Sequence, residues 1–324
     1  MGSIERLMKG KKMRLRKKNI VVGVMIATLI ESMIFTGCSP TTHTKEDIPE
    51  TKYKQAGYAV KGEIEEDGTV KMTYALIGVK NKKITYVYLD QIEQNPHTDR
   101  HLFTNKELYT AYGLAYKGNK GEWSEQITAL SNYISGNSLT IDEVNDIPVY
   151  KKSEREQKVP KKGTDLAAGC ALDISDFLDV INEAYDNRED TDATRLAVGE
   201  DIRVNNLEGK LSATIGFVGT NYRYKICYSH LESYTVDVDT DKEIISTKEK
   251  AEMDDSIKNI ANGEKAFEKY IEGLNMVEAY GVETYDPGDG VNTALPKVDT
   301  DLAQICNIDL SKDILVLKEI AGRL

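Results

Sequence analysis

The chain has 324 residues, of which 40% are hydrophobic, and it carries a formal net charge of −11. A chain of this length and apolar content can bury real hydrophobic cores, which excludes a wholly disordered protein and a disulfide-stapled miniprotein. The acidic balance argues against a nucleic-acid-binding protein.

The charge is unevenly distributed along the chain. Residues 1–37 hold eight Lys and Arg against two Asp and Glu, a net charge of +6, which leaves −17 for residues 38–324. A basic run followed at once by eleven apolar-type residues, 20–30, is typical of an export signal. Eleven residues are fewer than the roughly 20 that span a bilayer, so a cleaved signal peptide over 1–37 is favoured over an uncleaved anchor.

The predicted signal ends in a motif that resembles a bacterial lipobox. Residues 34–38 read Ile-Phe-Thr-Gly-Cys, with small residues before the cysteine. The resemblance implies that processing leaves Cys38 as a diacylglyceryl-modified first residue. We therefore expect a protein anchored by lipid to the extracellular face of the bacterial cytoplasmic membrane, with residues 38–55 as a polar tether.

The first half of the exported chain changes from sheet signals to helix signals. Residues 70–79 and 84–92 are rich in β-branched and aromatic residues and flank a turn signal, which predicts a β-hairpin. A helix follows, because four apolar residues recur at spacings of four, three and four: Trp123, Ile127, Leu130 and Ile134. Gly136 stands where a left-handed C-cap is expected. A last helix is predicted over 176–185.

The second half follows the same order. Strands are predicted over three segments: 211–218, 222–228 and 234–238. Ile260, Phe267 and Ile271 indicate a helix in which Gly263 is a candidate break, and a final helix is predicted over 312–321. Residues 187–207, which begin with an acidic stretch, are predicted to form the linker between the halves.

The two halves are copies of one unit. Residues 164–175 recur as 300–311 at an offset of 136, and residues 129–136 recur as 266–273 at an offset of 137. A period this long indicates duplication of a whole folding unit rather than a solenoid repeat. Because strands precede helices in each copy, we predict an α+β fold with mainly antiparallel sheets and packed helices, in two tandem domains over 56–186 and 208–324.

Three motifs of the first copy carry a family resemblance: Trp-x-Glu-Gln at 123–126, Tyr-Ile-x-Gly at 133–136 and Gly-Thr-Asp-Leu-x-Ala-Gly at 163–169. With the hairpin before them, they resemble the FMN-binding-domain lipoproteins of Gram-positive bacteria, over residues 56–324. That family includes peptide-pheromone precursor lipoproteins and a two-domain flavoprotein of extracellular electron transfer. The resemblance implies a flavoprotein that passes electrons from a membrane quinone pool to acceptors outside the cell.

In that family a loop receives FMN through a phosphoester to its last hydroxyl. We name the matching segments loop 1, residues 165–171, and loop 2, residues 301–307. The acceptor position holds Ala171 in loop 1 and Asn307 in loop 2, and neither side chain has the hydroxyl that a phosphoester needs. Covalent FMN is therefore not expected, which leaves noncovalent FMN as the cofactor. Loop 2 also has Ile305 in place of Gly169, which hinders close approach of a phosphate to the backbone.

Loop 1 has two interpretations. In the first, noncovalent FMN lies beside Asp165, over Gly169 and Cys170 and the N-terminus of the following helix, and Trp123 stacks on its ring. In the second, the loop is a relic in which Asp165 caps local backbone, Leu166 fills the core and Trp123 is a core residue. The missing acceptor hydroxyls favour the relic.

Loop 2 is the more degenerate site, with Asp301, Cys306 and Asn307 at the positions equivalent to Asp165, Cys170 and Ala171. Buried packing explains Cys170 and Cys306 more simply than a redox pair or a disulfide does. Together with Cys227 they make three cysteines after Cys38, so at least one thiol is expected to be free.

Two functions follow from the resemblance and its departures. The first is a redox relay with noncovalent FMN, which makes the protein an electron carrier or binding protein rather than a catalyst with turnover. The second is a non-redox binding or structural lipoprotein that has lost its flavin, with a pheromone-like peptide released from residues 32–37. The absence of a hydroxyl at positions 171 and 307 favours the second function.

The lipobox assignment can be tested by the substitution Cys38→Ala. We expect this variant to lack the diacylglyceryl group and to lose its attachment to membranes, because Cys38 is the lipidated residue. Intact mass and membrane fractionation measure both properties, and Cys227→Ala is the control that should keep them. Membrane retention of Cys38→Ala without the lipid would instead indicate an uncleaved anchor.

Overall fold

The computed structural model describes residues 52–324, apart from 100, 109–112, 116–119 and 153–156. Residues 49–324 belong to one compact unit. The predicted signal peptide, Cys38 and residues 38–51 of the tether lie outside the described residues. Within the described part of the chain, no helix has the length and apolar character needed to cross a bilayer.

Two antiparallel sheets form the middle of this unit. The first sheet has the strand order β3-β2-β1-β6, and the second has the order β7-β8-β9. The first contains β1 (Gln55–Ile64), β2 (Val70–Lys80), β3 (Lys83–Gln94) and the short β6 (Glu189–Asp190). The second contains β7 (Arg195–Asn205), β8 (Lys210–Thr220) and β9 (Ile226–Asp237).

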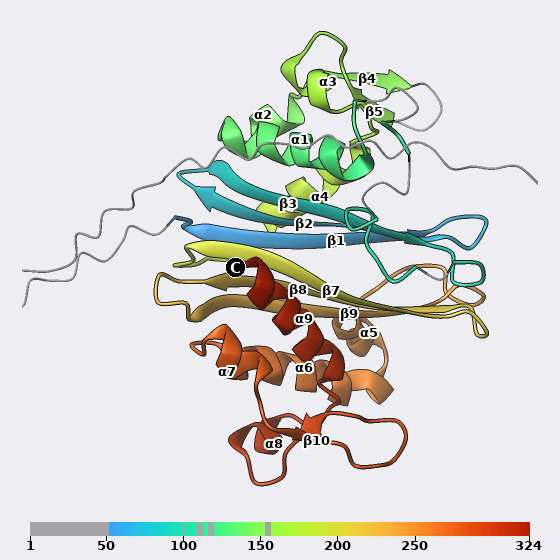
Figure 1. Ribbon diagram of the computed structural model, residues 1–324, viewed down its shortest axis with the longest axis vertical. Helices are drawn as coiled ribbons and strands as arrows, with labels where there is room; N and C mark the ends of the chain where they lie inside the picture. The colour runs from blue at the N-terminus through green and yellow to red at the C-terminus, as the bar shows by residue number, and fades with distance from the viewer. Residues whose placement is uncertain (1–51, 100, 109–112, 116–119, 153–156) are drawn as a thin grey trace, which may run out of the picture. The chain divides into compact units, whose positions relative to one another are not determined.

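The two sheets pack face to face and share one hydrophobic core (Figure 1). Successive side chains of a strand point to opposite faces, so each sheet turns every second residue toward the other sheet. Tyr74 on β2 and Phe217 on β8 are fully buried in this core, and the rings of Tyr58 and Phe217 stack with their centroids 4.6 Å apart. This shared core joins the two copies.

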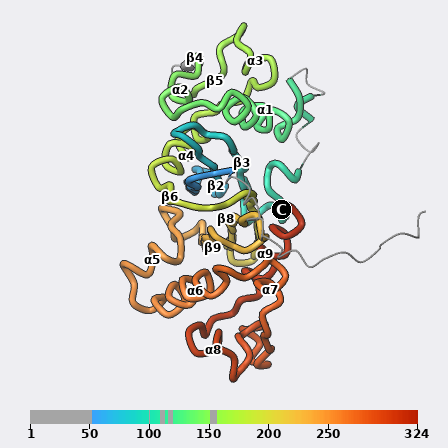
Figure 2. Tube along the Cα trace, turned by 90° about the vertical axis from the view of Figure 1, so that its left-hand side faces the viewer, coloured from blue at the N-terminus to red at the C-terminus, as the bar shows by residue number. Residues whose placement is uncertain are grey.

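Helices cover the outer face of each sheet, so the unit has four layers, helix, sheet, sheet and helix (Figure 2). The first copy supplies α1 (Trp123–Gly136), α2 (Ile141–Asn145), α3 (Asp165–Gly169) and α4 (Ser175–Asp186), with the small hairpin β4 (Val149–Lys152) and β5 (Gln157–Pro160). The predicted apolar faces of α1 and α4 are confirmed, because Ile127, Leu130, Val180 and Ile181 are all fully buried.

The second copy supplies the opposite helical layer. Its elements are α5 (Thr247–Met253), η1 (Asp255–Ile257), α6 (Lys258–Ile271), α7 (Met276–Tyr280), β10 (Thr284–Tyr285), β11 (Leu295–Pro296), α8 (Asp301–Ile305) and α9 (Ser311–Arg323). Helices and antiparallel sheets together confirm the predicted α+β class. The order of elements matches the first copy, except that α5 and η1 are added after the sheet.

The copies agree in fine detail as well as in order. Each long hairpin has a register shift at the same place, between Gly78 and Val79 in the first copy and between Gly219 and Thr220 in the second. An isolated bridge then joins each hairpin turn to the N-cap of a short helix, Thr140 of α2 or Asn275 of α7. Such matching irregularities indicate duplication of one folding unit.

The structure does not confirm two separate domains, because both copies contribute to one core. The predicted linker 187–207 is wrong for most of its length, since β6 and β7 lie within it. Leu196, Val198 and Ile202 of β7 are buried against the first sheet. The acidic stretch before β7 concealed this strand in the sequence.

Three local predictions also need correction. The segments 222–228 and 234–238 contribute to one strand, β9, rather than to two. Gly136 is the last residue of α1 rather than a left-handed cap, and the positive φ of 49° falls at Ser138. Gly263 does not break α6: a Cβ there would lie 2.5 Å from Cγ2 of Ile308, so the glycine lets loop and helix approach each other.

The shared core predicts cooperative unfolding of both copies. Phe217→Ala should lower the free energy of unfolding by about 3–5 kcal/mol, because it leaves a cavity between the two sheets. Urea denaturation followed by circular dichroism should show one transition at lower urea for this variant. Leu207→Ala, at a side chain that is 98% exposed, is the control and should change stability by less than about 0.5 kcal/mol. Two separate transitions would contradict a shared core.

Candidate functional site

Loop 1 begins as a short helix whose cap is not the residue predicted. The hydroxyl of Thr164 accepts a hydrogen bond from the backbone N–H of Ala167, while Asp165 is exposed. In loop 2, Thr300 caps the backbone N–H of Ala303 in the same way and Asp301 is exposed. The capping role predicted for Asp165 therefore belongs to the threonine before it.

Helix α1 closes loop 1 from one side. A Cβ at Gly169 would lie 2.9 Å from Cβ of Ala129, so the glycine is needed for close packing of the loop on the helix. The backbone N–H of Ala171 donates to Oε1 of Gln126 at 2.8 Å. Ala171 holds the position equivalent to the flavin acceptor, and its backbone N–H is therefore not free to donate to a phosphate.

The buried residues predicted around loop 1 belong to the core. Trp123 meets Phe177 edge to face, with ring centroids 5.9 Å apart, and both lie in the core under the first helical layer. Cys170 and Cys306 are buried free thiols, and burial raises the pKa of Cys170 to about 11. A thiol with so high a pKa stays protonated, which fits packing rather than redox chemistry.

The second copy has a cavity where the first copy is filled. This loop-2 cavity has a volume of about 700 Å³ and lies between the end of loop 2, the first turn of α9, helices α5 and α6, and β9. Asn307, at the acceptor-equivalent position, lines it. Loop 2 is therefore the repeated segment that borders a space large enough for a ligand.

The repeat alignment explains the cavity. The offsets of 137 and 136 pair three core residues of the first copy with three residues that line the cavity of the second: Trp123 with Ile260, Ile127 with Glu264, and Phe177 with Asp313. In the first copy the indole and phenyl rings fill this position. Smaller and polar side chains leave the equivalent volume open in the second copy.

A lysine in the first turn of helix α9 lines the loop-2 cavity. Lys312 is half-buried and donates to the hydroxyl of Ser212 at 3.3 Å. Burial, and then the nearby positive charge of Arg203, lowers the pKa of Lys312. No carboxylate among the described residues lies within 4.0 Å of its ammonium group, whereas Arg203 pairs with Asp201 at 2.7 Å.

The first copy closes the equivalent position with ion pairs. Asp176, which the offset of 136 aligns with Lys312, pairs with Lys71 at 2.5 Å, and Lys71 also pairs with Glu63 at 3.1 Å. The hollow beside them has a volume of only about 30 Å³. The exchange of Asp176 for Lys312 is visible in the repeat alignment, and it is the sequence signal that could have identified this lysine.

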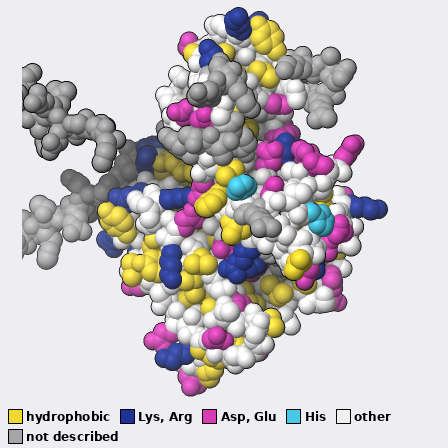
Figure 3. All heavy atoms as spheres, turned by 45° about the vertical axis from the view of Figure 1, so that its right-hand side comes forward, with side chains coloured by type: hydrophobic (Ala, Val, Ile, Leu, Met, Phe, Trp, Pro, Cys, Tyr) yellow, Lys and Arg dark blue, Asp and Glu magenta, His cyan; other side chains and the backbone are white. Residues whose placement is uncertain are grey.

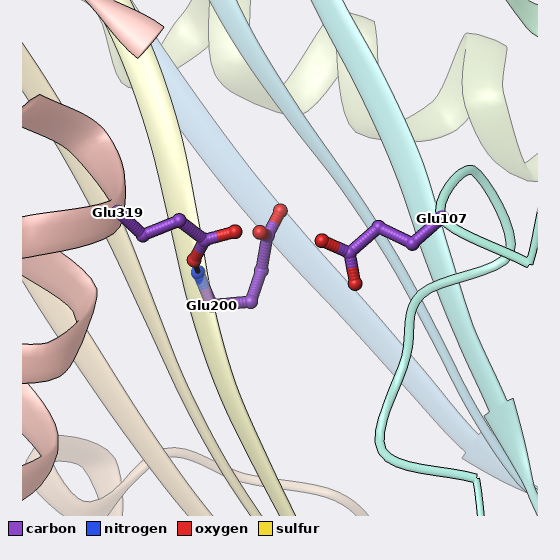
Figure 4. Close-up of side chains that lie close together, drawn as sticks. All are labelled: Glu107, Glu200 and Glu319. Carbon is purple, nitrogen blue, oxygen red and sulfur yellow. Dashed lines mark hydrogen bonds between the residues drawn. The ribbon is translucent and has the colours of Figure 1, made fainter. Parts of the chain in front are cut away.

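A second polar cluster lies at the edge where β3, β7 and α9 meet. Carboxylate oxygens of Glu107, Glu200 and Glu319 all lie within 4.8 Å of one another, and Figure 4 shows the three side chains turned toward one another. Arg323 bonds to all three, at 3.3, 3.0 and 2.5 Å respectively. The guanidinium supplies the positive charge that such a group requires, so the cluster is a structural clamp.

Charges elsewhere on the unit are mixed. On the face drawn in Figure 3, acidic and basic side chains of the described residues are interspersed, and no single patch of one sign extends across it. The loop-2 cavity is therefore distinguished by its shape and by Lys312, which has no salt bridge among the described residues, rather than by a large electrostatic field.

Comparison with known proteins yields little. No protein family model matches the chain, and no curated protein matches it. A solution NMR structure of a Clostridium thermocellum protein, a structural-genomics target, is 21% identical over 41% of this chain and 89% of that chain, with a TM-score of 0.24. A likeness of this strength identifies neither fold nor function.

The clamp predicts a pH-dependent cost for the loss of Arg323. Arg323→Gln should lower the free energy of unfolding by about 3–5 kcal/mol at pH 8, because the side chain of Glu200 is only 2% exposed and loses its counter-charge. Burial already raises the pKa of Glu200, and without Arg323 the pKa rises further. A carboxyl with a raised folded-state pKa loses stability as pH rises, so the cost should be smaller at pH 5.

Urea unfolding at the two pH values measures this difference. Arg223→Gln, at an exposed arginine outside the cluster, should change stability little at either pH. An equal cost for Arg323→Gln at pH 5 and pH 8 would contradict the clamp.

Proposed function

We propose that this protein is an exported, lipid-anchored electron carrier that holds FMN noncovalently in the loop-2 cavity. The observation that carries the proposal is the position of Asn307. The resemblance places the flavin-bearing residue there, and in the second copy that position borders a cavity that Lys312 also lines. This proposal moves the flavin from loop 1, where the sequence suggested it, to loop 2.

The polar end of the cavity fits a phosphate. Lys312 lies in the first turn of α9, a helix of 13 residues, and the dipole at a helix N-terminus favours anions. The backbone N–H of Ser311 already donates to Asp309 at 2.7 Å, so a phosphate here would depend on Lys312 and on the remaining N–H groups of the turn. Arg203 lies on the same side of the cavity. A phosphate here would give the ammonium group of Lys312 a charged partner; among the described residues it donates to the Ser212 hydroxyl.

The apolar part of the cavity lining fits a ring system. Ile257, Ile260 and Ile308 line the cavity, and Ile260 is 46% exposed. A volume of about 700 Å³ lies within the roughly 300–1,000 Å³ of small-molecule sites. The residues present therefore fit FMN held without a covalent bond, since Asn307 cannot form a phosphoester.

A non-redox binding protein is the second candidate function. The observation that favours it is the closed state of loop 1, where Gly169 packs on α1 and Ala171 bonds to Gln126. In the first copy these contacts close the space beside loop 1. In this candidate the second copy keeps the space but binds a ligand other than flavin. In this candidate the cavity binds a phosphorylated small molecule that does not exchange electrons.

Lys312→Ala tests the phosphate position. A charge-assisted hydrogen bond contributes about 1.5–3 kcal/mol, so its loss should weaken FMN binding by about tenfold or more. Titration with FMN, followed by its fluorescence, measures the affinity. Lys318→Ala removes the same charge from an exposed position of the same helix, and it should bind FMN like the unmodified protein.

Protein isolated from its native host separates the two candidate functions. Flavin absorbance with an unmodified intact mass would support noncovalent FMN and an electron carrier. Colourless protein that also fails to take up added FMN would overturn the flavin proposal and leave the non-redox candidate. A mass gain of one FMN would show that another residue serves as a covalent acceptor.

A further inference from the structure

Two buried carboxyl groups lie in the wall of the loop-2 cavity. Glu264 projects from α6 and Asp313 from the first turn of α9, and each residue is only 4% exposed. Oε2 of Glu264 and Oδ1 of Asp313 have no hydrogen-bond partner among the described residues. Buried polar atoms in native proteins are nearly always bonded, so two such atoms beside one cavity need a partner within it, either ordered water or a ligand.

The repeat shows that these carboxyl groups replaced a hydrophobic contact. Their equivalents in the first copy, Ile127 and Phe177, are buried core residues beneath the first helical layer. Such a replacement costs stability unless the polar groups are bonded. Two of them, in neighbouring positions of one core, point to a binding role.

The neighbouring charges do not neutralise the pair. Three further charged groups lie around it: Glu232 on β9, Lys248 on α5 and Glu268 on α6. Lys248 donates to Glu268 at 2.7 Å, to Glu232 at 3.1 Å and to the backbone oxygen of Leu231 at 2.8 Å. An ammonium group has three N–H donors, so none remains for Glu264 or Asp313.

Four carboxyl groups therefore lie around one ammonium group that contacts only two of them, which favours the protonated form of Glu264 and Asp313. Burial is the main cause that raises the pKa of Glu264 to about 7 and that of Asp313 to about 8, and the charge of Glu264 adds to the rise at Asp313. The hydroxyl of Ser233 and the charge of Lys248 act in the opposite direction on Glu264. Lys312, Arg203 and Asp309 also line the cavity.

We infer that Glu264 and Asp313 act as neutral carboxylic acids that donate hydrogen bonds to an uncharged, acceptor-rich edge of the ligand in the loop-2 cavity. A protonated carboxyl needs an acceptor, and carbonyl oxygens or ring nitrogens of a heteroaromatic ligand supply it. Because Lys312 lines the same cavity, we expect its ligand to combine an anionic group with such an edge. This inference rests on the proposed function of the cavity and specifies the second part of its ligand.

The amide variant Glu264→Gln/Asp313→Asn tests the pair, because amides keep the shape and donate N–H at every pH. Riboflavin is the probe, since it has the acceptor edge of FMN but no phosphate. The unmodified protein should bind riboflavin about tenfold more weakly at pH 9 than at pH 6.5, as the acids lose their protons. The amide variant should bind about equally at both pH values, and Glu252→Gln, at an exposed position on α5, should behave like the unmodified protein.

Several outcomes would overturn the inference. These are failure of riboflavin to bind at pH 6.5, a pH dependence that survives in the amide variant, or stabilisation by Ca²⁺ or Mg²⁺ that the amide variant abolishes, which would identify a cation site. The proposed function fails separately: if riboflavin binds as expected but FMN binds no more tightly, the phosphate position is wrong and the acid pair stands.

A ligand-free measurement checks the protonation state. Acids whose folded-state pKa is raised contribute stability below about pH 4 that is lost as pH rises toward 7 and 8. The melting temperature, measured from pH 4.5 to pH 8.5, should therefore fall less steeply with pH in the amide variant than in the unmodified protein. Identical slopes would show that the two carboxyl groups are ionised, which contradicts the inference.

Discussion

The packing of two antiparallel sheets against each other is the constraint on which the rest of the structure depends. Each copy presents one sheet face to its own helices and the other face to the second copy. Tyr74 and Phe217 are fully buried between the sheets. Separating the copies would expose this apolar surface to water, which is unfavourable. Duplication therefore produced one four-layer unit, and the two helical layers lie on its outer sides, where each is free to diverge.

Divergence followed different routes in the two layers. In the first, Trp123 and Phe177 fill the space under α1, and ion pairs of Lys71 close the surface beside α4. In the second, the equivalent positions carry Ile260 and Asp313, and a cavity remains. The first layer adds stability to the unit. The second has polar side chains at positions where the first has core residues, and Glu264 and Asp313 each have a buried oxygen with no hydrogen-bond partner among the described residues. This pattern fits a binding site better than a structural role.

Parts of this architecture follow from local sequence rules. The spacing of Trp123, Ile127, Leu130 and Ile134 predicted α1, because a helix places such residues on one face. The strand β7 was missed because it follows an acidic stretch that has the composition of a linker. The cap was assigned to Asp165 rather than Thr164 because both residue types cap helices, and only the backbone conformation distinguishes them.

The sequence by itself determined the α+β class and the duplication, together with the absence of an acceptor hydroxyl at Ala171 and Asn307, because these depend on residue identity and order. Only the tertiary structure decided that the copies share a core and which loop borders a cavity. The physical reason is that a cavity is set by side chains distant in sequence. Glu264 and Asp313 are 49 positions apart, and their missing partners become visible only when α6 and α9 pack together.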